Sequence, residues 1–432
     1  MKFFRISKSI DVNILLSFNN YFIFFLVAIP NLVISKQFFI TTHNIAKILI
    51  VINFIILFFR GQLIDKNIKM RNIFLIINGY IIFLSLSILG AVNIFSYLKN
   101  FFNIIISVLY FYTIFVKEKI EINKFIFIIY LSFIINLTIQ FLNLIFPYTV
   151  NIIPYQNWEF INYQITRGKL FTEIMNEIFI LLIFFIFYEM NKSKMYNFIG
   201  FFLIIVSIYF SILSRWTSKF VLMLISLLLF PLLFDRKKWF LIILLFFIFL
   251  IKNPLLNGFY MKSSIFGSAF IFEEDKNITF NARFNFWRAA YEMGIKKWLY
   301  GVGLGNFYDN LSFSLQIKSI SSVIDLNKSI IVIDDPHNIF LNVLASSGVY
   351  ALIFFVFLIF FFIIYDFLAI KENKDILLNC FIFSFWLLFL FGAYNPSNTF
   401  SYNFLLWGLR GIIFNLQKHN IKNKDYFLLR KS

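Results

Sequence analysis

Residues 281–307 read NARFNFWRAAYEMGIKKWLYGVGLGNF, and residues 334–351 read DDPHNIFLNVLASSGVYA. Both pieces belong to the one long polar interval of a chain that is otherwise a succession of apolar runs. The first piece holds two arginines among aromatic residues. The second holds His337, one of the chain's three histidines, behind an acidic turn and a proline. The apolar runs on either side indicate what kind of protein carries this interval.

The composition is that of a polytopic membrane protein. Of 432 residues, 60% are hydrophobic and only 14% are charged, whereas a soluble domain has about 45–50% apolar and about 25% charged residues. The single cysteine, Cys380, lies in an apolar run, which excludes a disulfide framework and a cysteine-based metal site. The net charge of +18 comes mostly from Lys and Arg in short loops, and these indicate membrane topology, not nucleic-acid binding.

The apolar runs predict an all-α fold of about twelve transmembrane helices, because about 20 apolar residues span the hydrocarbon core. The predicted spans lie near residues 14–34, 45–59, 73–90, 101–116, 125–146, 171–188, 197–213, 219–234, 239–251, 349–368, 376–393 and 401–414.

The distribution of positive charge predicts the orientation. If the N-terminus is cytoplasmic, the loops on its side carry clusters of Lys and Arg, and the opposite short loops carry few. The positive-inside rule then places both termini in the cytoplasm. We expect a single membrane domain, residues 1–432, with one large outer loop at residues 252–348.

The outer loop faces a compartment without ATP or nucleotide sugars. GVGLG at residues 301–305 also lacks the spacing and the strand–helix context of a dinucleotide-binding loop. We interpret it as a turn in which only glycine fits the backbone.

His337 is the first candidate for chemistry. Asp335 suits a helix N-cap and Pro336 the first helical position, and Gly348 can end this helix or let it bend into the next apolar run. His337 in the first turn would meet the positive end of the helix dipole, which favours the neutral imidazole. Such an imidazole can accept a proton from a hydroxyl group. The alternative is a histidine that only caps or packs at a loop end.

Residues 281–294 also predict a helix. Arg288 and Glu292 are four residues apart and can form an ion pair. Arg283 has no acidic residue at helical spacing, and its neighbour four residues on is Trp287, on which a guanidinium can stack. An unpaired arginine at a membrane surface is a candidate for contact with a phosphate.

Two further arginines, Arg167 and Arg215, lie on the predicted outer side. Glu173 and Glu177 are four residues apart near the outer end of the sixth predicted span. They can line a polar cavity or pair with Arg167 or Lys169. The acidic runs at residues 273–275 and 334–335 are typical of a solvated loop or a helix cap. We predict no metal site and no cofactor, although Mg²⁺ shared with a pyrophosphate stays open.

His337 and Asn338, then nine residues, then Gly348 make up the most specific motif. It resembles the signature of ligases in the O-antigen ligase and O-antigen polymerase superfamily of bacterial membrane glycosyltransferases. That signature continues with Gly, Thr or Tyr where this chain has Ala351. Arg283, four residues before a Trp and ahead of a Gly-rich turn, also resembles the superfamily, as do Ser-Arg at residues 214–215 and Arg-Gly at residues 167–168.

The resemblance implies a helical GT-C-type fold in the bacterial inner membrane, with a periplasmic active site that needs no metal. The donor would be a glycan on undecaprenyl pyrophosphate, and the acceptor a lipid A-core sugar or a second lipid-linked repeat. Carried over to this chain, the catalytic residues would be His337, Arg283 and Arg215. The substrate-binding residues would be Arg167, Arg288, Asn338 and Trp287.

Four functions stay open at this point. An O-antigen ligase would transfer the finished glycan to lipid A-core, and an O-antigen polymerase would join lipid-linked repeats. The short loop at residues 148–170 favours the ligase. The spacing of Arg283 to Gly294 resembles that of a polymerase. Protein O-glycosylation is a third possibility. A transporter would carry polar residues near the bilayer midplane, whereas here they gather at the outer surface.

Overall fold

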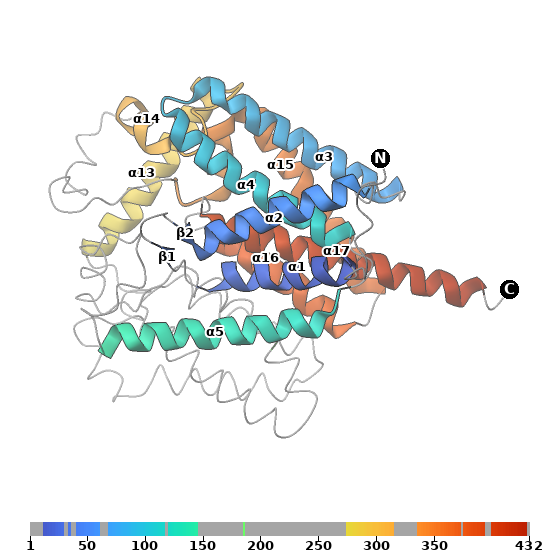
Figure 1. The fold of residues 1–432 in the computed structure, drawn as a ribbon. Coiled ribbons are helices and arrows are strands. Elements are labelled where there is room, and N and C mark those ends of the chain that lie inside the picture. The colour runs from blue at the N-terminus through green and yellow to red at the C-terminus, as the bar shows by residue number, and fades with distance from the viewer. Residues whose placement is uncertain are drawn as a thin grey trace, which may run out of the picture. The chain divides into compact units, whose positions relative to one another are not determined.

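The computed structural model describes residues 12–29, 33–35, 40–60, 68–116, 120–145, 185, 274–314, 335–372, 375–393 and 399–429. This part of the chain is α-helical, as predicted, apart from a short antiparallel pair of strands, β1 (Val33–Ser35) and β2 (Ile40–Thr41). The helices, shown in Figure 1, are α1 (Val12–Ala28), α2 (Thr42–Phe59), α3 (Ile68–Leu86), the 3₁₀ helix η1 (Ser87–Gly90), α4 (Ile94–Val116), α5 (Ile122–Ile145), α13 (Glu274–Lys296), α14 (Phe307–Ser314), α15 (Ile339–Glu372), α16 (Ile376–Gly392) and α17 (Phe400–Leu429).

Within the described residues, four helical stretches are long and apolar enough to cross a membrane: 42–59, 73–90, 94–116 and 339–371. Three shorter apolar helices lie at 16–28, 122–136 and 376–392. These seven coincide with predicted spans, and the chain is a membrane protein. The predicted spans at 171–188, 197–213, 219–234 and 239–251 lie outside the described residues except for Phe185, and the predicted span at 401–414 lies within α17, which is not among these seven apolar stretches. The total of twelve therefore stays a prediction.

The chain divides into two compact units. The first comprises residues 1–65, 106–155 and 407–432, and the second comprises residues 66–105 and 156–406. In the first unit, α1 packs on α2 and α5. Buried amides connect α1 to α2, since the Asn53 side chain donates to Asn20 Oδ1 at 3.1 Å. The Tyr110 hydroxyl donates to the carbonyl of the same Asn20 at 2.9 Å. Each amide thus finds a partner inside an apolar bundle, as a buried polar group requires.

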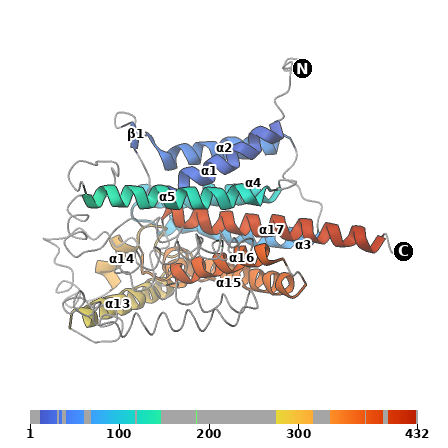
Figure 2. The same ribbon diagram turned by 90° about the horizontal axis from the view of Figure 1, so that it is seen from below.

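The second unit is organised around α15. Its middle lies along α3, where Phe83 and Phe354 stack with ring centroids 5.1 Å apart and a Cβ on Gly79 would collide with Phe354. On the C-terminal side, α15 packs on α16, its neighbour in both views (Figure 2). Trp386 of α16 donates to the buried Asp366 carboxylate at 2.9 Å. Aromatic stacking on α3 and the hydrogen bond from Trp386 therefore help to hold α15 between α3 and α16.

A break at Gly348 divides α15. This glycine has φ 83° and ψ −177°, far from helical values. In a continuous helix, the amides of residues 349 and 350 would donate to the carbonyls of Ala345 and Ser346. Here Val349 N–H donates instead to the Trp298 carbonyl at 2.7 Å. The expectation that Gly348 ends or bends the helix is confirmed.

The Gly-rich turn at residues 301–305 supplies the missing donors. Val302 N–H donates to the Ala345 carbonyl at 2.8 Å, and Gly303 N–H donates to the Ser346 carbonyl at 2.9 Å. All three glycines of the turn have positive φ, as the interpretation of GVGLG requires. A Cβ on Gly301 would lie 2.4 Å from the backbone between residues 346 and 347. The turn therefore supplies hydrogen-bond donors to the two carbonyls at the break in α15, and this requires the two backbones to lie close together.

We predict that Gly348→Ala lowers the stability of the fold by about 1–3 kcal/mol, because only glycine adopts these backbone angles without strain. The new Cβ would also lie 2.5 Å from the Trp298 carbonyl oxygen. The measurement is the thermal unfolding midpoint of the purified, detergent-solubilised protein.

The matched control is Gly408→Ala in α17, where a Cβ meets only the Tyr110 ring at 3.1 Å. We expect its midpoint to stay near that of the wild type. The close contact with Tyr110 is unfavourable, but alanine favours a helix over glycine by about 1 kcal/mol, and the two effects offset each other. Equal midpoints for Gly348→Ala and the wild type would contradict the assigned role of the break.

Candidate functional site

The segment before α15 folds differently from its prediction. The helix begins at Ile339, and the Asn338 side chain caps it by accepting from the amides of Phe340 at 3.1 Å and Leu341 at 3.0 Å. The expectation that Asp335 caps a helix starting at Pro336 is wrong. His337 has φ 56°, a left-handed conformation through which an α-helix does not continue. The helix therefore starts after His337.

Asp335 binds His337 instead. Its Oδ1 accepts from the backbone N–H of His337 at 2.8 Å and lies 3.0 Å from the imidazole Nδ1. The carboxylate is 1% exposed and the histidine side chain 27% exposed. A carboxylate only accepts hydrogen bonds, so an imidazole in its neutral form would present Nδ1–H to Asp335 and keep its lone pair on Nε2. This arrangement suits a general base whose ring is oriented by a buried anion.

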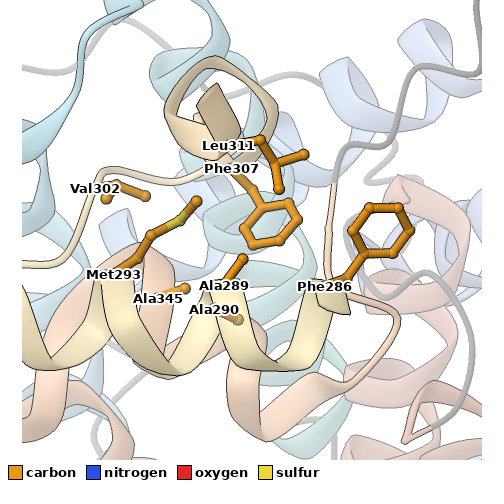
Figure 3. Packing of buried hydrophobic residues seen from close by; sticks show 8 residues of the cluster. All are labelled: Phe286, Ala289, Ala290, Met293, Val302, Phe307, Leu311 and Ala345. Atoms are coloured by element: carbon orange, nitrogen blue, oxygen red, sulfur yellow. The ribbon is translucent and has the colours of Figure 1, made fainter. Parts of the chain in front are cut away.

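Helix α13 packs against the first part of α15. Its inner face packs against the Gly-rich turn, α14 and α15 in one apolar cluster (Figure 3). The cluster consists of Phe286, Ala289, Ala290, Met293, Val302, Phe307, Leu311 and Ala345. Small residues at its centre allow close approach, and a Cβ on Gly294 would lie 2.4 Å from Leu344. The predicted helix at residues 281–294 is thus confirmed and extends over Glu274–Lys296.

The contacts also give the relative direction of α13 and the first part of α15. Gly294 meets Leu344, and Trp298, two residues after α13, meets Val349, just past the break, so the chain runs in the same direction through the two segments. Trp287 lies seven residues before Gly294, and His337 likewise lies seven residues before Leu344. The N-terminal ends of both segments therefore point the same way.

The polar side chains on α13 differ in their surroundings. Arg288 pairs with Glu292 at 3.2 Å, as its spacing predicted, and its side chain is 68% exposed. Such a surface pair contributes about 0–1 kcal/mol. Trp287 has a buried indole N–H without a hydrogen-bond partner in the described part of the chain. Arg283 lies on the same helix, and its side chain is outside the described residues.

The other predicted site residues are not all described. Arg167, Arg215, Glu173 and Glu177 lie outside the described residues. Asn338 is described, and its side chain caps α15. Within the described residues no three His, Cys, Asp or Glu side chains gather as a metal site would need, and the absence of a metal stays a prediction.

One set of contacts near the site was not predicted. Asn306, directly after the Gly-rich turn, is fully buried and donates to the Asn93 carbonyl at 3.2 Å, while its own side-chain oxygen accepts from the Asn93 amide. Ser96 of α4 donates to the Gly305 carbonyl at 2.8 Å. These bonds join the turn to the connection between η1 and α4. The only signal in the sequence is the Asn that follows Gly305.

Part of the chain matches a known family model. Residues 178–356 match the family model described as O-Antigen ligase. The matched segment includes α13, the Gly-rich turn, His337 and the first part of α15. The predicted resemblance to the O-antigen ligase and polymerase superfamily is confirmed, and it indicates a membrane enzyme of the glycosyltransferase type. No curated protein sequence matches the chain.

We predict that Asn338→Ala lowers stability by about 1 kcal/mol through loss of the helix cap, whereas Asn338→Asp keeps it, because both side chains accept from the first-turn amides. The measurement is again the thermal midpoint in detergent. A substrate-binding role beyond capping would show as lost activity in Asn338→Asp at unchanged stability. Equal midpoints for all three proteins would contradict the capping role.

Proposed function

We propose that this protein is an O-antigen ligase-like glycosyltransferase. It transfers a glycan from undecaprenyl pyrophosphate to a lipid A-core acceptor at the periplasmic face of the bacterial inner membrane. The observation that carries the proposal is the pair of a buried Asp335 and a partly exposed His337, inside the segment that matches the O-antigen ligase model.

In the proposed reaction, a hydroxyl oxygen of the acceptor attacks the anomeric carbon of the donor sugar. A new glycosidic bond forms, and the bond from that carbon to the pyrophosphate oxygen breaks with inversion. The hydroxyl proton passes to Nε2 of His337. Undecaprenyl pyrophosphate leaves with the electron pair of the broken bond, so atoms and charge balance without a metal or cofactor.

Asp335 has two proposed roles in this step. It holds the imidazole in the tautomer whose Nε2 can accept a proton, and it stabilises the imidazolium that forms. Burial supports both roles, because a carboxylate screened from water interacts more strongly with a neighbouring charge. The left-handed backbone of His337 supports a functional assignment too, since strained residues gather at active sites.

The arginines are assigned to the pyrophosphate. Arg283 and Arg215 would stabilise the charge that develops on the leaving group. Arg167, Arg288 and Trp287 would bind the substrate. The common direction of α13 and the first part of α15 supports this assignment for α13, because Arg283 and Trp287, in the middle of α13, lie on the same side of the Gly294–Leu344 contact as His337. The partnerless indole N–H of Trp287 is a donor for a phosphate or sugar oxygen.

The alternative is an O-antigen polymerase that uses the same donor and a second lipid-linked repeat as acceptor. A lipopolysaccharide gel from cells lacking the gene separates the two. Core without any repeat, with polymer on the lipid carrier, indicates the ligase. Core with one repeat and no longer chains indicates the polymerase. A normal pattern contradicts both and favours protein O-glycosylation or transport.

We predict that His337→Ala and Arg283→Ala both fail to restore the gel pattern in these cells at normal membrane levels. Loss of a general base costs about 10²–10⁴-fold in rate, and loss of an arginine at the leaving group removes charge stabilisation. Lys296→Ala, which removes an exposed cation from the same helix, serves as the matched control and should restore the pattern. Restoration by His337→Ala would contradict the proposed base.

We predict that Asp335→Asn lowers kcat by about 10²-fold, within the range for a general base, and leaves KM near its wild-type value. The amide of Asn can donate to Nδ1, which would move the proton to Nε2 and block proton uptake there. The measurement is transfer by purified protein from undecaprenyl-pyrophosphate-linked glycan. Asp309→Asn, an exposed carboxylate on α14, is the control. An unchanged kcat, or a change in KM alone, would contradict the orienting role.

A further inference from the structure

The outer face of α13 is apolar, although the helix belongs to the polar interval. Phe284, Arg288, Tyr291 and Ile295 follow one another at steps of four and three residues, which places them on one stripe of the helix, and Trp298 in the turn just after α13 continues this spacing. The four apolar members are exposed by 58%, 56%, 49% and 52% respectively. The opposite face is buried in the cluster of Figure 3. A helix with one face in the core and the other in water would carry polar residues on this stripe.

This stripe continues onto a membrane-spanning helix. The ring of Trp298 lies 5.8 Å from the ring of Tyr350 in α15, and the backbones of Trp298 and Val349 share a hydrogen bond. Tyr350 begins the exposed row of α15, which continues through Ile353, Phe357 and Phe360. Because α15 is long and apolar enough to cross a bilayer, this exposed row is the part of the helix that would meet lipid. The two rows thus form one exposed apolar surface.

We propose that α13 lies in the headgroup–acyl boundary of the bilayer, with its stripe immersed in lipid. The leaflet is the one that α15 enters in its first turns after Gly348. The residue types fit this boundary, where Trp and Tyr gather. They also fit an interfacial helix, which pairs large apolar residues with cations. Arg288 on the stripe and Lys296 beside it are exposed, and long cationic side chains reach the headgroups from such positions.

A second copy of the chain is the competing occupant of this stripe. The stripe is continuous with the exposed row of α15, which favours lipid as the occupant of both. A second copy bound to α13 alone would end between Trp298 and Tyr350, so that these neighbouring side chains would meet protein and lipid respectively. The proposal does not depend on the reaction assigned above. A membrane-surface α13 would hold His337 at the depth of a lipid headgroup whatever the lipid carries.

The test uses nitroxide labels on the full chain in proteoliposomes that contain anionic lipid. The single cysteine, Cys380, is buried, so Cys380→Ala gives a background for Tyr291→Cys and Ile295→Cys on the stripe. Asp309→Cys on α14 is the control, because Asp309 is exposed and ionisable and such a group stays in water. Collision rates with oxygen, which concentrates in lipid, and with a water-soluble nickel chelate are measured for each label.

We expect both stripe labels to shift toward oxygen and away from the nickel chelate relative to the Asp309→Cys label. Access to the nickel chelate equal to that of the control would overturn the proposal. Shielding from both reagents would also overturn it, because protein would then cover the stripe. Spin–spin broadening that disappears on dilution with unlabelled protein would identify a second copy as the occupant. Two stripe positions keep the test decisive if one variant fails to fold.

Discussion

The exchange of backbone hydrogen bonds at Gly348 is the constraint on which the second unit depends. A break in a membrane helix leaves carbonyls and an amide without partners, and hydrocarbon supplies none. Here the Gly-rich turn satisfies the carbonyls of Ala345 and Ser346, and the Trp298 carbonyl, just after α13, accepts from Val349. These bonds require close backbone approach, which is why a Cβ at Gly301 or at Gly348 would collide with the facing backbone. The break, the turn and α13 are therefore one structural element.

This element gives α13 two faces with different tasks. One face packs on the first part of α15 and so determines how the helix that follows His337 is held. The other face is exposed and apolar, and it continues onto the span after Gly348. In the proposed function, the first face brings the α13 arginine toward the histidine, and the second keeps both at the membrane surface where a lipid-linked donor presents its pyrophosphate. A stable break in α15 thus serves both binding and chemistry.

Much of this architecture could be predicted from the sequence, because long apolar runs and helical spacing are local signals. The bend at Gly348, the helix at residues 281–294 and the pair of Arg288 with Glu292 are examples. The start of α15 was predicted wrongly, since Asp and Asn cap helices about equally well and the left-handed His337 decides between them. The contact of Asp335 with the imidazole is local, but it depends on the unusual backbone of His337, which residue spacing does not encode. The contact of Asn306 with Asn93, 213 residues earlier in the chain, depends on tertiary packing.

The most direct test of the central claim is an experimental structure of the full chain in a lipid nanodisc with a bound polyprenyl pyrophosphate. The account predicts that the pyrophosphate lies between the N-terminal part of α13 and the start of α15. Arg283 should contact its oxygens, and Nε2 of His337 should face the open space beside it. A pyrophosphate bound elsewhere, or an imidazole turned so that Nε2 meets Asp335, would contradict the account.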